Sequence, residues 1–339
     1  MNSAINRRPY RTLYLLLVFC LILTLCGCRK TDRAEGTATG STAVTEAEEN
    51  KEEKITAAPP TEATTEEASL QTGEETGTTA EEPESEVPED RTISWDPNWE
   101  YADFSEIHDS GVKLYYSHAP SRKNMVVAVN AGHGTTGGES VKTLSHPDGT
   151  GKVNGGTNGE GAVYSMAISS GMEFDDGTPE ASAVLSLALL LKDALLEEGF
   201  DVLMIREEAD TRLDNIARTV FANNNADCHI ALHYDSTDSD KGAFYVAVPD
   251  VASYRHMEPV ASHWKEHHAL GEALIKGLDK TGVPIFKGGS IELDLIQTSY
   301  STIPSVDLEL GDRASDYSGK TQERLAEGIV KGLSTYKDR

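Results

Sequence analysis

Residues 126–134 read Val126-Val-Ala-Val-Asn-Ala-Gly-His-Gly134, and this stretch decides the fold that the sequence predicts. A run rich in valine is typical of a buried strand. The two glycines allow the backbone to turn sharply at His133. In open α/β sheets, ligands bind at the carboxyl ends of the strands. We therefore expect His133 to lie at a sheet edge where a functional site can form.

Two later stretches also place a chemically active side chain at the end of an apparent strand. Cys228-His-Ile-Ala-Leu-His233 ends in a second histidine, and Ser305-Val-Asp-Leu-Glu309 ends in a carboxylate. Each of them alone is explained by a polar residue that caps a strand. Because the carboxyl ends of parallel strands meet at one edge of a sheet, the set as a whole predicts a common site.

The charge of the chain is strongly acidic and unevenly distributed. The 339 residues include 56 Asp and Glu against 30 Lys and Arg, a net charge of −26. Residues 31–90 carry a large share of the acids and few large apolar side chains, and the remainder has the composition of roughly one domain. The acidic balance argues against a nucleic acid partner, whose phosphates require Lys and Arg.

The N-terminus has the pattern of a secretion signal. Arg7, Arg8 and Arg11 precede an apolar run over residues 13–25, which is short for a membrane span and suits a signal peptide. The run ends in Leu25-Cys-Gly-Cys28, which resembles the lipobox of bacterial lipoproteins because Gly27 is the small residue before Cys28. We predict a signal peptide over residues 1–27 and a lipid on Cys28. A plain signal peptide or an uncleaved anchor would also place the protein outside the cytoplasm.

Residues 28–94 are predicted to be a disordered tether. They consist mainly of Thr, Glu, Ala, Gly and Pro and have too little apolar surface to offset the loss of chain entropy. A coil of this length spans on the order of 50 Å, more when like charges repel. The tether therefore suits a domain held away from a bacterial membrane, although a solubilising spacer without a reach requirement has the same composition.

Residues 95–339 are predicted to form a single α/β domain. The strands expected there lie at 112–117, 126–131, 201–205, 228–233, 242–248, 290–296 and 305–309, and the helices at 178–198, 213–225, 253–280 and 320–336. Strands that alternate with helices favour a largely parallel sheet with helices on both faces. Cys228, in one of these strands, is expected to be a buried thiol without a disulfide.

Residues 134–179 form a long insertion rich in Gly, Ser, Thr and Asp. Segments of this length without regular structure are usually functional or disordered. The glycines are not followed by Gly-Lys-Ser/Thr, so they do not form a phosphate loop. Because the insertion lies between two candidate site residues, we expect it to wall or cover the site.

His133, Glu180 and His233 are the candidate metal ligands. Two histidines and one carboxylate, with an open fourth position, are the arrangement of a catalytic zinc site. Glu180 opens the predicted helix over residues 178–198, where it could instead be an acid that complements the helix dipole. A carboxylate off the metal can carry a proton from water to a leaving amine, and Glu309 is the candidate. His263 and His267, one helical turn apart, could also bind a metal, although a solvated helix face is favoured.

From Val126 onward the chain resembles the catalytic domain of zinc-dependent N-acetylmuramoyl-L-alanine amidases, which hydrolyse peptidoglycan. The features shared with that family follow the same order along both chains. They are Gly132-His133-Gly134, Glu180 at the start of the first long helix, a strand that ends at Arg206, a helix with Leu213, Arg218 and Ala222-Asn223, a strand that ends at His233, and Pro304 followed by Glu309-Leu310-Gly311.

The resemblance implies a single α/β domain with a roughly six-stranded sheet. It also implies zinc bound by His133, Glu180 and His233, with Glu309 as the catalytic residue. The expected reaction is hydrolysis of the amide between N-acetylmuramic acid and L-alanine, by a monomer that contacts peptidoglycan and, through its lipid, the cell membrane. The alternatives are a wall-binding lipoprotein without turnover and a zinc hydrolase of another wall amide.

Two features depart from the family pattern. Typical members have a Phe after the glycine that corresponds to Gly311, where this chain has Asp312. The segment between His133 and the first long helix is also longer than usual. Neither departure removes a candidate ligand, but both bear on the preference for particular peptide stems.

Overall fold

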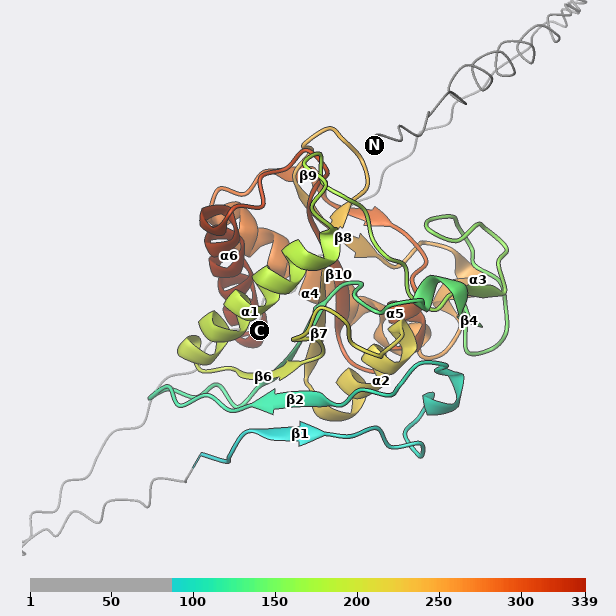
Figure 1. The fold of residues 1–339 in the computed structure, drawn as a ribbon, viewed down its shortest axis with the longest axis horizontal. Coiled ribbons are helices and arrows are strands. Elements are labelled where there is room, and N and C mark those ends of the chain that lie inside the picture. The colour runs from blue at the N-terminus through green and yellow to red at the C-terminus, as the bar shows by residue number, and fades with distance from the viewer. Residues whose placement is uncertain (1–86) are drawn as a thin grey trace, which may run out of the picture. The chain divides into compact units, whose positions relative to one another are not determined.

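Strand β3 (Val126–Ala131) lies in the middle of the main sheet. In the computed structural model, which describes residues 87–339, β3 pairs in parallel with β6 (Asp201–Met204) on one side and with β7 (Cys228–Asp235) on the other (Figure 1). Val127 and Val129 contact the core on one face of the sheet, and Ala128 contacts the core on the other. A strand buried on both faces has to be apolar along its length, which explains the sequence pattern.

The main sheet has eight strands in the order β1-β2-β6-β3-β7-β10-β8-β9. Besides β3, β6 and β7, the sheet contains β1 (Arg91–Ile93), β2 (Val112–Tyr115), β8 (Ala243–Ala247), β9 (Ile285–Glu292) and β10 (Ser305–Asp312). Four neighbouring pairs are parallel and three are antiparallel, so the predicted mostly parallel sheet is confirmed. The implied six-stranded sheet corresponds to the part β6-β3-β7-β10-β8-β9, and β1 and β2 extend it by two antiparallel strands.

Strand β1 lies upstream of residue 95, where the sequence predicts the start of the folded domain. Its three residues pair with β2, and Ile93 is buried in the core on the face of the sheet that α2 (Asn215–Asn225) covers. This pairing carries the sheet back to Arg91, into the end of the stretch predicted as tether. A strand with a single buried residue is too short for its alternation to stand out in the sequence.

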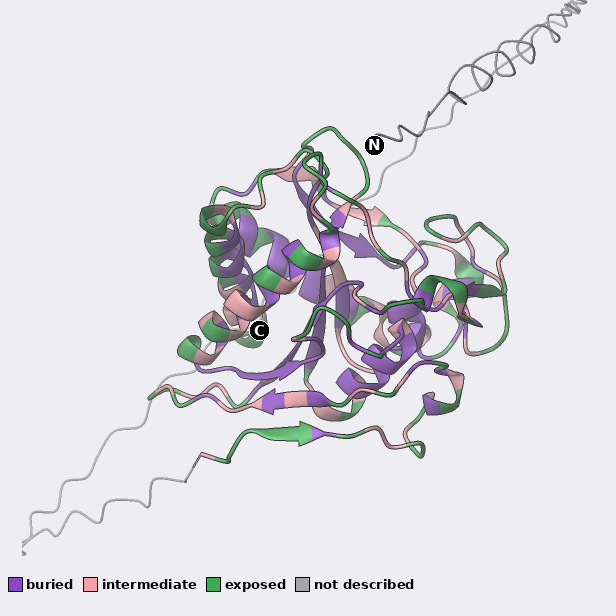
Figure 2. Cartoon of the chain, in the orientation of Figure 1, coloured by how far each residue is buried: buried purple, intermediate pink, exposed green. Residues whose placement is uncertain are grey.

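Helices cover both faces of the sheet, as predicted. On one face α1 (Glu180–Glu198), α4 (Val260–Lys280) and α6 (Gly319–Lys337) pack against the apolar residues of β3, β7 and β10 (Figure 1). On the other face α2 (Asn215–Asn225) and α5 (Ile296–Tyr300) lie together. Buried residues follow the strands and the inward sides of the helices (Figure 2), so the core has two layers with the sheet between them.

Two predicted elements differ from those observed. The helix expected over residues 253–280 is divided into α3 (Ala252–Arg255) and α4, with Pro259 at the junction. Proline lacks the N–H that a helix interior requires, which explains the interruption. The strand expected over residues 290–296 begins earlier, as β9, and its last predicted residue instead starts α5. Alternation over so few residues does not by itself distinguish a strand from a strand followed by a helical turn.

The N-terminal predictions concern residues outside the described range. The predicted signal peptide over residues 1–27, the lipidated Cys28 and the tether up to residue 86 all lie there. Among residues 87–339, no helix combines the length and the apolar composition needed to cross a membrane. Cys228, which is described, is buried and carries a free thiol.

Candidate metal centre and its cavity

Three elements bring His133, Glu180 and His233 together. His133 follows β3, Glu180 is the first residue of α1, and His233 lies on β7. Glu180 Oε1 lies 2.9 Å from His133 Nε2 and 3.1 Å from His233 Nδ1. The two histidine nitrogens are 3.0 Å apart. The three residues therefore direct one donor atom each toward a common point, and they are the group of described residues with the geometry to hold a metal ion.

Glycines make this convergence sterically possible. A Cβ on Gly132 would lie 2.2 Å from the ring of His233, and a Cβ on Gly171 would lie 2.8 Å from the ring of His133. His133 itself has a positive φ of 62°, an uncommon conformation for a residue with a side chain. The flanking glycine permits the close approach of the two rings, so the Gly-His-Gly sequence encodes the position of both histidines.

Two buried arginines hold the backbone around the site. Arg206 donates hydrogen bonds to the carbonyl of Gly132 at 2.9 Å and to that of Ala181 in α1 at 2.8 Å. Arg218 donates to the carbonyl of His133 at 2.6 Å. Burial lowers the pKa of Arg206 to about 10, and burial together with repulsion from Arg206 lowers the pKa of Arg218 to about 9. Both therefore remain charged at neutral pH; Arg206 ties the His133 turn to the start of α1, and Arg218 ties it to α2.

The candidate ligands are also held by contacts with the surrounding chain. His133 Nδ1 lies 2.9 Å from the carbonyl oxygen of Ser169, which can only accept, so Nδ1 carries the proton and Nε2 is free to donate a lone pair. Glu180 Oε1 accepts from the N–H of Tyr234 at 3.0 Å, and Oε2 accepts from the N–H of Met172 at 2.9 Å. Contacts of this kind orient metal ligands in proteins.

The carboxylate of Glu180 points away from its own helix. It contacts His133 and His233 and accepts from N–H groups outside α1, so its position is not explained by complementing the helix dipole. Burial acts to raise the pKa of Glu180, but its interactions with the two histidine rings outweigh burial and hold the pKa well below its usual value. Glu180 is therefore ionised throughout the physiological range.

Glu309 and Asp307 form a second carboxylate pair beside the histidines. Glu309 on β10 lies opposite His233 on β7 in the parallel register, and Asp307, two residues earlier, faces the same side of the strand. Asp307 Oδ2 is 3.7 Å from His233 Nε2. Asp307 Oδ1 and Glu309 Oε2 are buried without a hydrogen-bond partner among the described residues. Burial and the charge of Asp307 raise the pKa of Glu309 well above its usual value.

The five residues open onto a cavity of about 660 Å³. That volume is typical of a ligand-binding site. The insertion supplies one of its walls, with Glu139, Lys152, Gly156, Thr157, Asn158, Met166, Ile168, Ser169, Ser170, Gly171 and Met172. Residues 293–297, which lead from β9 into α5, form an adjoining part of the wall. The insertion therefore walls the site, as the sequence predicts.

The insertion contains regular structure that was not predicted. A short 3-10 helix, η2 (Gly138–Ser140), precedes two strands, β4 (Lys142–Leu144) and β5 (Tyr164–Met166), which pair antiparallel. Strands of three residues give too little alternation to be recognised in a Gly-rich segment. The insertion is thus a small folded subsheet rather than an irregular loop.

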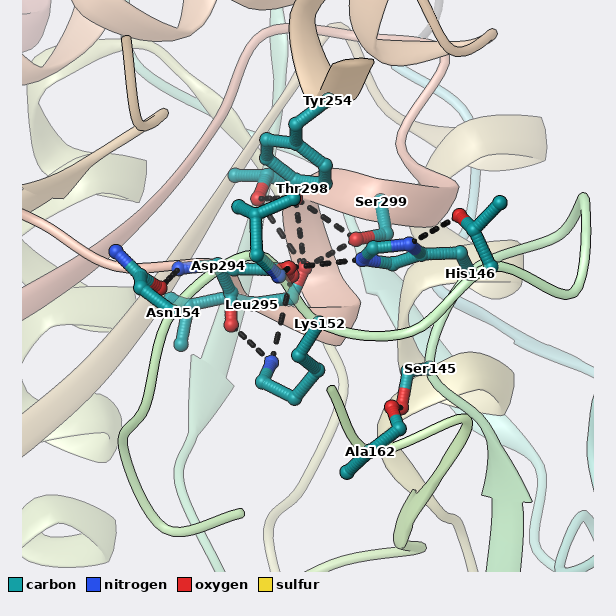
Figure 3. Close-up of polar contacts among 12 residues, drawn as sticks. Ser145, His146, Lys152, Asn154, Ala162, Tyr254, Asp294, Leu295, Thr298 and Ser299 are labelled. Atoms are coloured by element: carbon teal, nitrogen blue, oxygen red, sulfur yellow. Dashed lines mark hydrogen bonds and ion pairs between the residues drawn. The ribbon is translucent and has the colours of Figure 1, made fainter. Parts of the chain in front are cut away.

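A buried polar network joins the insertion to the connection between β9 and α5 (Figure 3). His146 Nε2 donates to Asp294 Oδ2 at 2.9 Å, and the N–H of Val153 donates to the same oxygen at 2.8 Å. His146 Nδ1 lies 2.8 Å from the hydroxyl of Thr150. Lys152 Nζ contacts the carbonyl and carboxylate of Asp294. Asp294 therefore fixes the insertion over the cavity.

The prediction for His267 was wrong. His267 is only 2% exposed, and its Nδ1 accepts a hydrogen bond from the N–H of Ser305 at 3.0 Å. It therefore belongs to the contact between α4 and the start of β10 rather than to a solvated helix face. His263, one turn earlier, lies 3.2 Å from Glu266, its neighbour on the same helix. The periodicity of α4 could not show which of the two histidines faces β10.

Asp312, which replaces the aromatic residue expected from the family pattern, organises a loop. Its carboxylate accepts hydrogen bonds from the N–H of Ser239 at 3.1 Å and of Asp240 at 3.0 Å, and from the hydroxyl of Thr237 at 3.1 Å. These residues belong to the connection between β7 and β8, which begins at the cavity. The carboxylate of Asp312 therefore fixes the conformation of this loop.

Comparisons with known proteins agree with this architecture. The family profile described as N-acetylmuramoyl-L-alanine amidase, Amidase_3, matches residues 127–335. The amidase Ami1 from Mycobacterium smegmatis has 19% sequence identity and a TM-score of 0.51, over 64% of this chain and 99% of that one. The apo form of Ami1 from Mycobacterium abscessus has 20% identity and a TM-score of 0.48, over 63% and 98%. A search of curated proteins gave no match. The similarity to Ami1 from Mycobacterium smegmatis shows a shared fold.

Proposed function

The chain belongs to the N-acetylmuramoyl-L-alanine amidase family, and on this premise we propose that it cleaves the amide between N-acetylmuramic acid and L-alanine in peptidoglycan with a zinc ion bound by His133, Glu180 and His233. The observation that carries the proposal is the convergence of one donor atom from each residue within 3.1 Å of the others. The donors come from three separate elements of the fold, and a chance ion pair would not require the glycines and arginines that hold them.

The donor set fits zinc. Zinc in catalytic sites is bound by three protein ligands drawn from His nitrogens and carboxylate oxygens, at about 2.0–2.2 Å, with a fourth position open. Here two imidazole nitrogens and one carboxylate oxygen face one point beside the cavity. When bound, zinc supplies a Lewis acid that polarises a carbonyl and lowers the pKa of water.

Glu309 would transfer the proton. It faces the cavity from β10 and is not one of the three grouped donors, and its unpartnered Oε2 is free to accept a proton from the attacking water. The same carboxyl can then protonate the departing amine of L-alanine. The raised pKa of Glu309 suits both steps, because a carboxylate with a raised pKa is a stronger base at neutral pH.

Asp307 would orient one of the ligands. Its carboxylate faces His233 Nε2, on the opposite side of the ring from the Nδ1 that faces Glu180. A negative charge there favours the tautomer with the proton on Nε2 and leaves the lone pair on Nδ1.

We also infer that the protein acts outside the cytoplasm, attached to the cell membrane by a lipid on Cys28. The support is the sequence of residues 1–28, with its basic start, apolar run and small residue before the cysteine. The acidic tether, with a span on the order of 50 Å, would let the domain reach the wall from the membrane.

The direct test is product analysis. The purified protein is incubated with purified peptidoglycan, and the new chain termini are identified. Free N-terminal L-alanine is the expected product, and the Glu309→Gln variant is the control for contaminating hydrolases. New termini within the peptide stem or cross-link would indicate a different wall amide. A zinc-loaded protein that binds the wall but releases nothing would indicate a binding protein.

A further inference from the structure

The insertion places one buried ammonium group in the cavity wall. Lys152 is 6% exposed, and among the described residues that line the cavity it is the one lysine or arginine. Its backbone is fixed, because its N–H donates to the carbonyl of Ala162 at 3.1 Å and its carbonyl accepts from the N–H of Gly161 at 2.8 Å. The position of the charge is therefore determined by the folded insertion rather than by a mobile surface chain.

The partner of Lys152 is Asp294, and the pairing leaves hydrogen-bonding capacity on the lysine. Asp294 Oδ2 is already bonded by His146 and by the N–H of Val153, so Lys152 Nζ lies against the carbonyl and Oδ1, the latter at 3.4 Å (Figure 3). An ammonium group has three N–H donors, and these two contacts use two of them. The third donor has no partner among the described residues, and Lys152 lines the cavity.

The other charged side chains that line the cavity, apart from the histidines, are carboxylates, so Lys152 differs from them in the sign of its charge. The carboxylates that line the cavity are Glu139, Glu180, Asp235, Asp294, Asp307 and Glu309. Burial lowers the pKa of Lys152, and the charge of Asp294 opposes this change. Away from the three grouped donors, an anionic group of a ligand would be repelled from most of the lining and attracted at Lys152.

We propose that Lys152 is a specificity-determining residue whose ammonium group binds a carboxylate of the peptide stem. The inference rests on the proposed function, because a peptide stem is the part of a peptidoglycan fragment that carries carboxylates. It assigns a binding role to the insertion, which is longer than the family pattern. A purely structural role, in which Lys152 only fastens the insertion to Asp294, predicts equal effects on acidic and amidated stems.

The experiment measures binding without turnover. In the Glu309→Gln background, loaded with zinc, the dissociation constants are measured by calorimetry for N-acetylmuramoyl-L-alanyl-D-glutamate and for its diamide, in which both glutamate carboxyls are carboxamides. We expect the acid to bind about tenfold more tightly than the diamide, since a hydrogen bond to a charged group contributes on this scale. Lys152→Gln should bring the two constants to within about twofold of each other.

Lys142→Gln is the matched control. Lys142 is exposed on β4 of the same insertion and does not line the cavity, so this variant removes an equal charge and should keep the tenfold preference. Thermal unfolding and zinc content of each variant verify the fold. Equal affinities in the parent, or a preference that survives Lys152→Gln, would overturn the inference while leaving the amidase proposal intact. Failure of the parent to bind either compound, or whole peptidoglycan, would refute both.

Discussion

Asp307 Oδ2 lies 3.7 Å from His233 Nε2, on the far side of the imidazole ring from the nitrogen that faces Glu180 and His133. The pair links β10 to β7 across the parallel register of the sheet. The carboxylate thus stands behind a proposed ligand rather than among the ligands, and its effect should be on how firmly the metal is held.

Asp307→Asn should therefore weaken zinc binding by roughly 10- to 100-fold, the range observed when a partner behind a ligand is removed. The measurement is competition against a chelator of known affinity. Asp238→Asn, on the exposed connection after β7, removes the same charge away from the site and should leave the affinity unchanged. An unchanged affinity in Asp307→Asn would show that the pair does not support His233.

Glu309→Gln should lower turnover of peptidoglycan by roughly 10²- to 10⁴-fold, the usual contribution of a positioned acid–base group. The substitution keeps the shape of the side chain, and Glu309 is not needed as a ligand, so zinc content and wall binding should stay near those of the parent. Turnover is followed as release of free N-terminal L-alanine. Retained turnover would remove the assigned role, whereas loss of zinc would make Glu309 a ligand.

Gly132→Ala should abolish metal binding, because the added Cβ would lie 2.2 Å from the His233 ring and would displace it. Gly171→Ala should do the same through His133, where the added Cβ would lie 2.8 Å from the ring and a positive φ adds strain. Gly159→Ala is the control, since a Cβ there meets nothing within 4 Å. Zinc stoichiometry after dialysis distinguishes the three. Full occupancy in both site variants would contradict the proposed ligand geometry.

The stability that two buried histidines contribute should be lost as the pH is lowered through about 6.5, the usual pKa of histidine. Burial lowers the pKa of His229 and of His267 to about 3, and nearby positive charge adds to the effect. The unfolded chain therefore binds protons that the folded chain cannot, and the stability present above pH 6.5 is lost as the pH falls toward 3. From pH 7.5 to 5.5, each histidine should cost about 1 kcal/mol.

Urea unfolding at the two pH values measures that loss, and His267→Gln should reduce it by the share of one histidine. The glutamine oxygen can still accept from the N–H of Ser305, so the variant should fold. Glu309 and His233, whose pKa values are raised in the folded protein, contribute with the opposite sign, but they contribute equally to parent and variant, so the difference between the two isolates His267. An identical pH dependence in parent and variant would mean that His267 is protonated in the folded protein.

Cys28→Ala should release the protein from the membrane fraction into the medium, since Cys28 is the cysteine that follows a small residue, Gly27, and carries the proposed lipid. Fractionation followed by immunoblotting measures the distribution. Gly27→Leu, which spoils the small residue before the cysteine, should have a similar effect. Unchanged membrane association of Cys28→Ala would rule out this anchor without affecting the assignment of the catalytic domain.

The parts of the fold that follow from local pattern could be predicted from the sequence. Strand β3 was identifiable because burial on both faces demands an apolar residue at nearly every position. The meeting of His133, Glu180 and His233 was predictable because the two histidines lie near the carboxyl ends of neighbouring parallel strands and Glu180 opens the first long helix. The family resemblance supplied their order.

The parts that depend on packing between distant segments could not be predicted. Lys152 and Asp294 are 142 residues apart, and no local pattern indicates that they meet. Asp307 lies two residues before Glu309, as any two neighbours on one face of a strand do. This spacing does not indicate that Asp307 approaches His233. His267 faces β10 rather than solvent because of how α4 lies on the sheet, which its sequence does not determine.

The hydrogen bonds of Arg206 and Arg218 hold the backbone near His133 without the help of a metal. The site is assembled by the polypeptide itself, so an ion that enters it does not have to drive folding, in contrast to a zinc finger, which is unfolded without metal. If the proposed zinc site is right, the metal-free chain should stay folded and should gain activity when zinc binds. Loss of zinc would then remove the activity reversibly, without unfolding the protein.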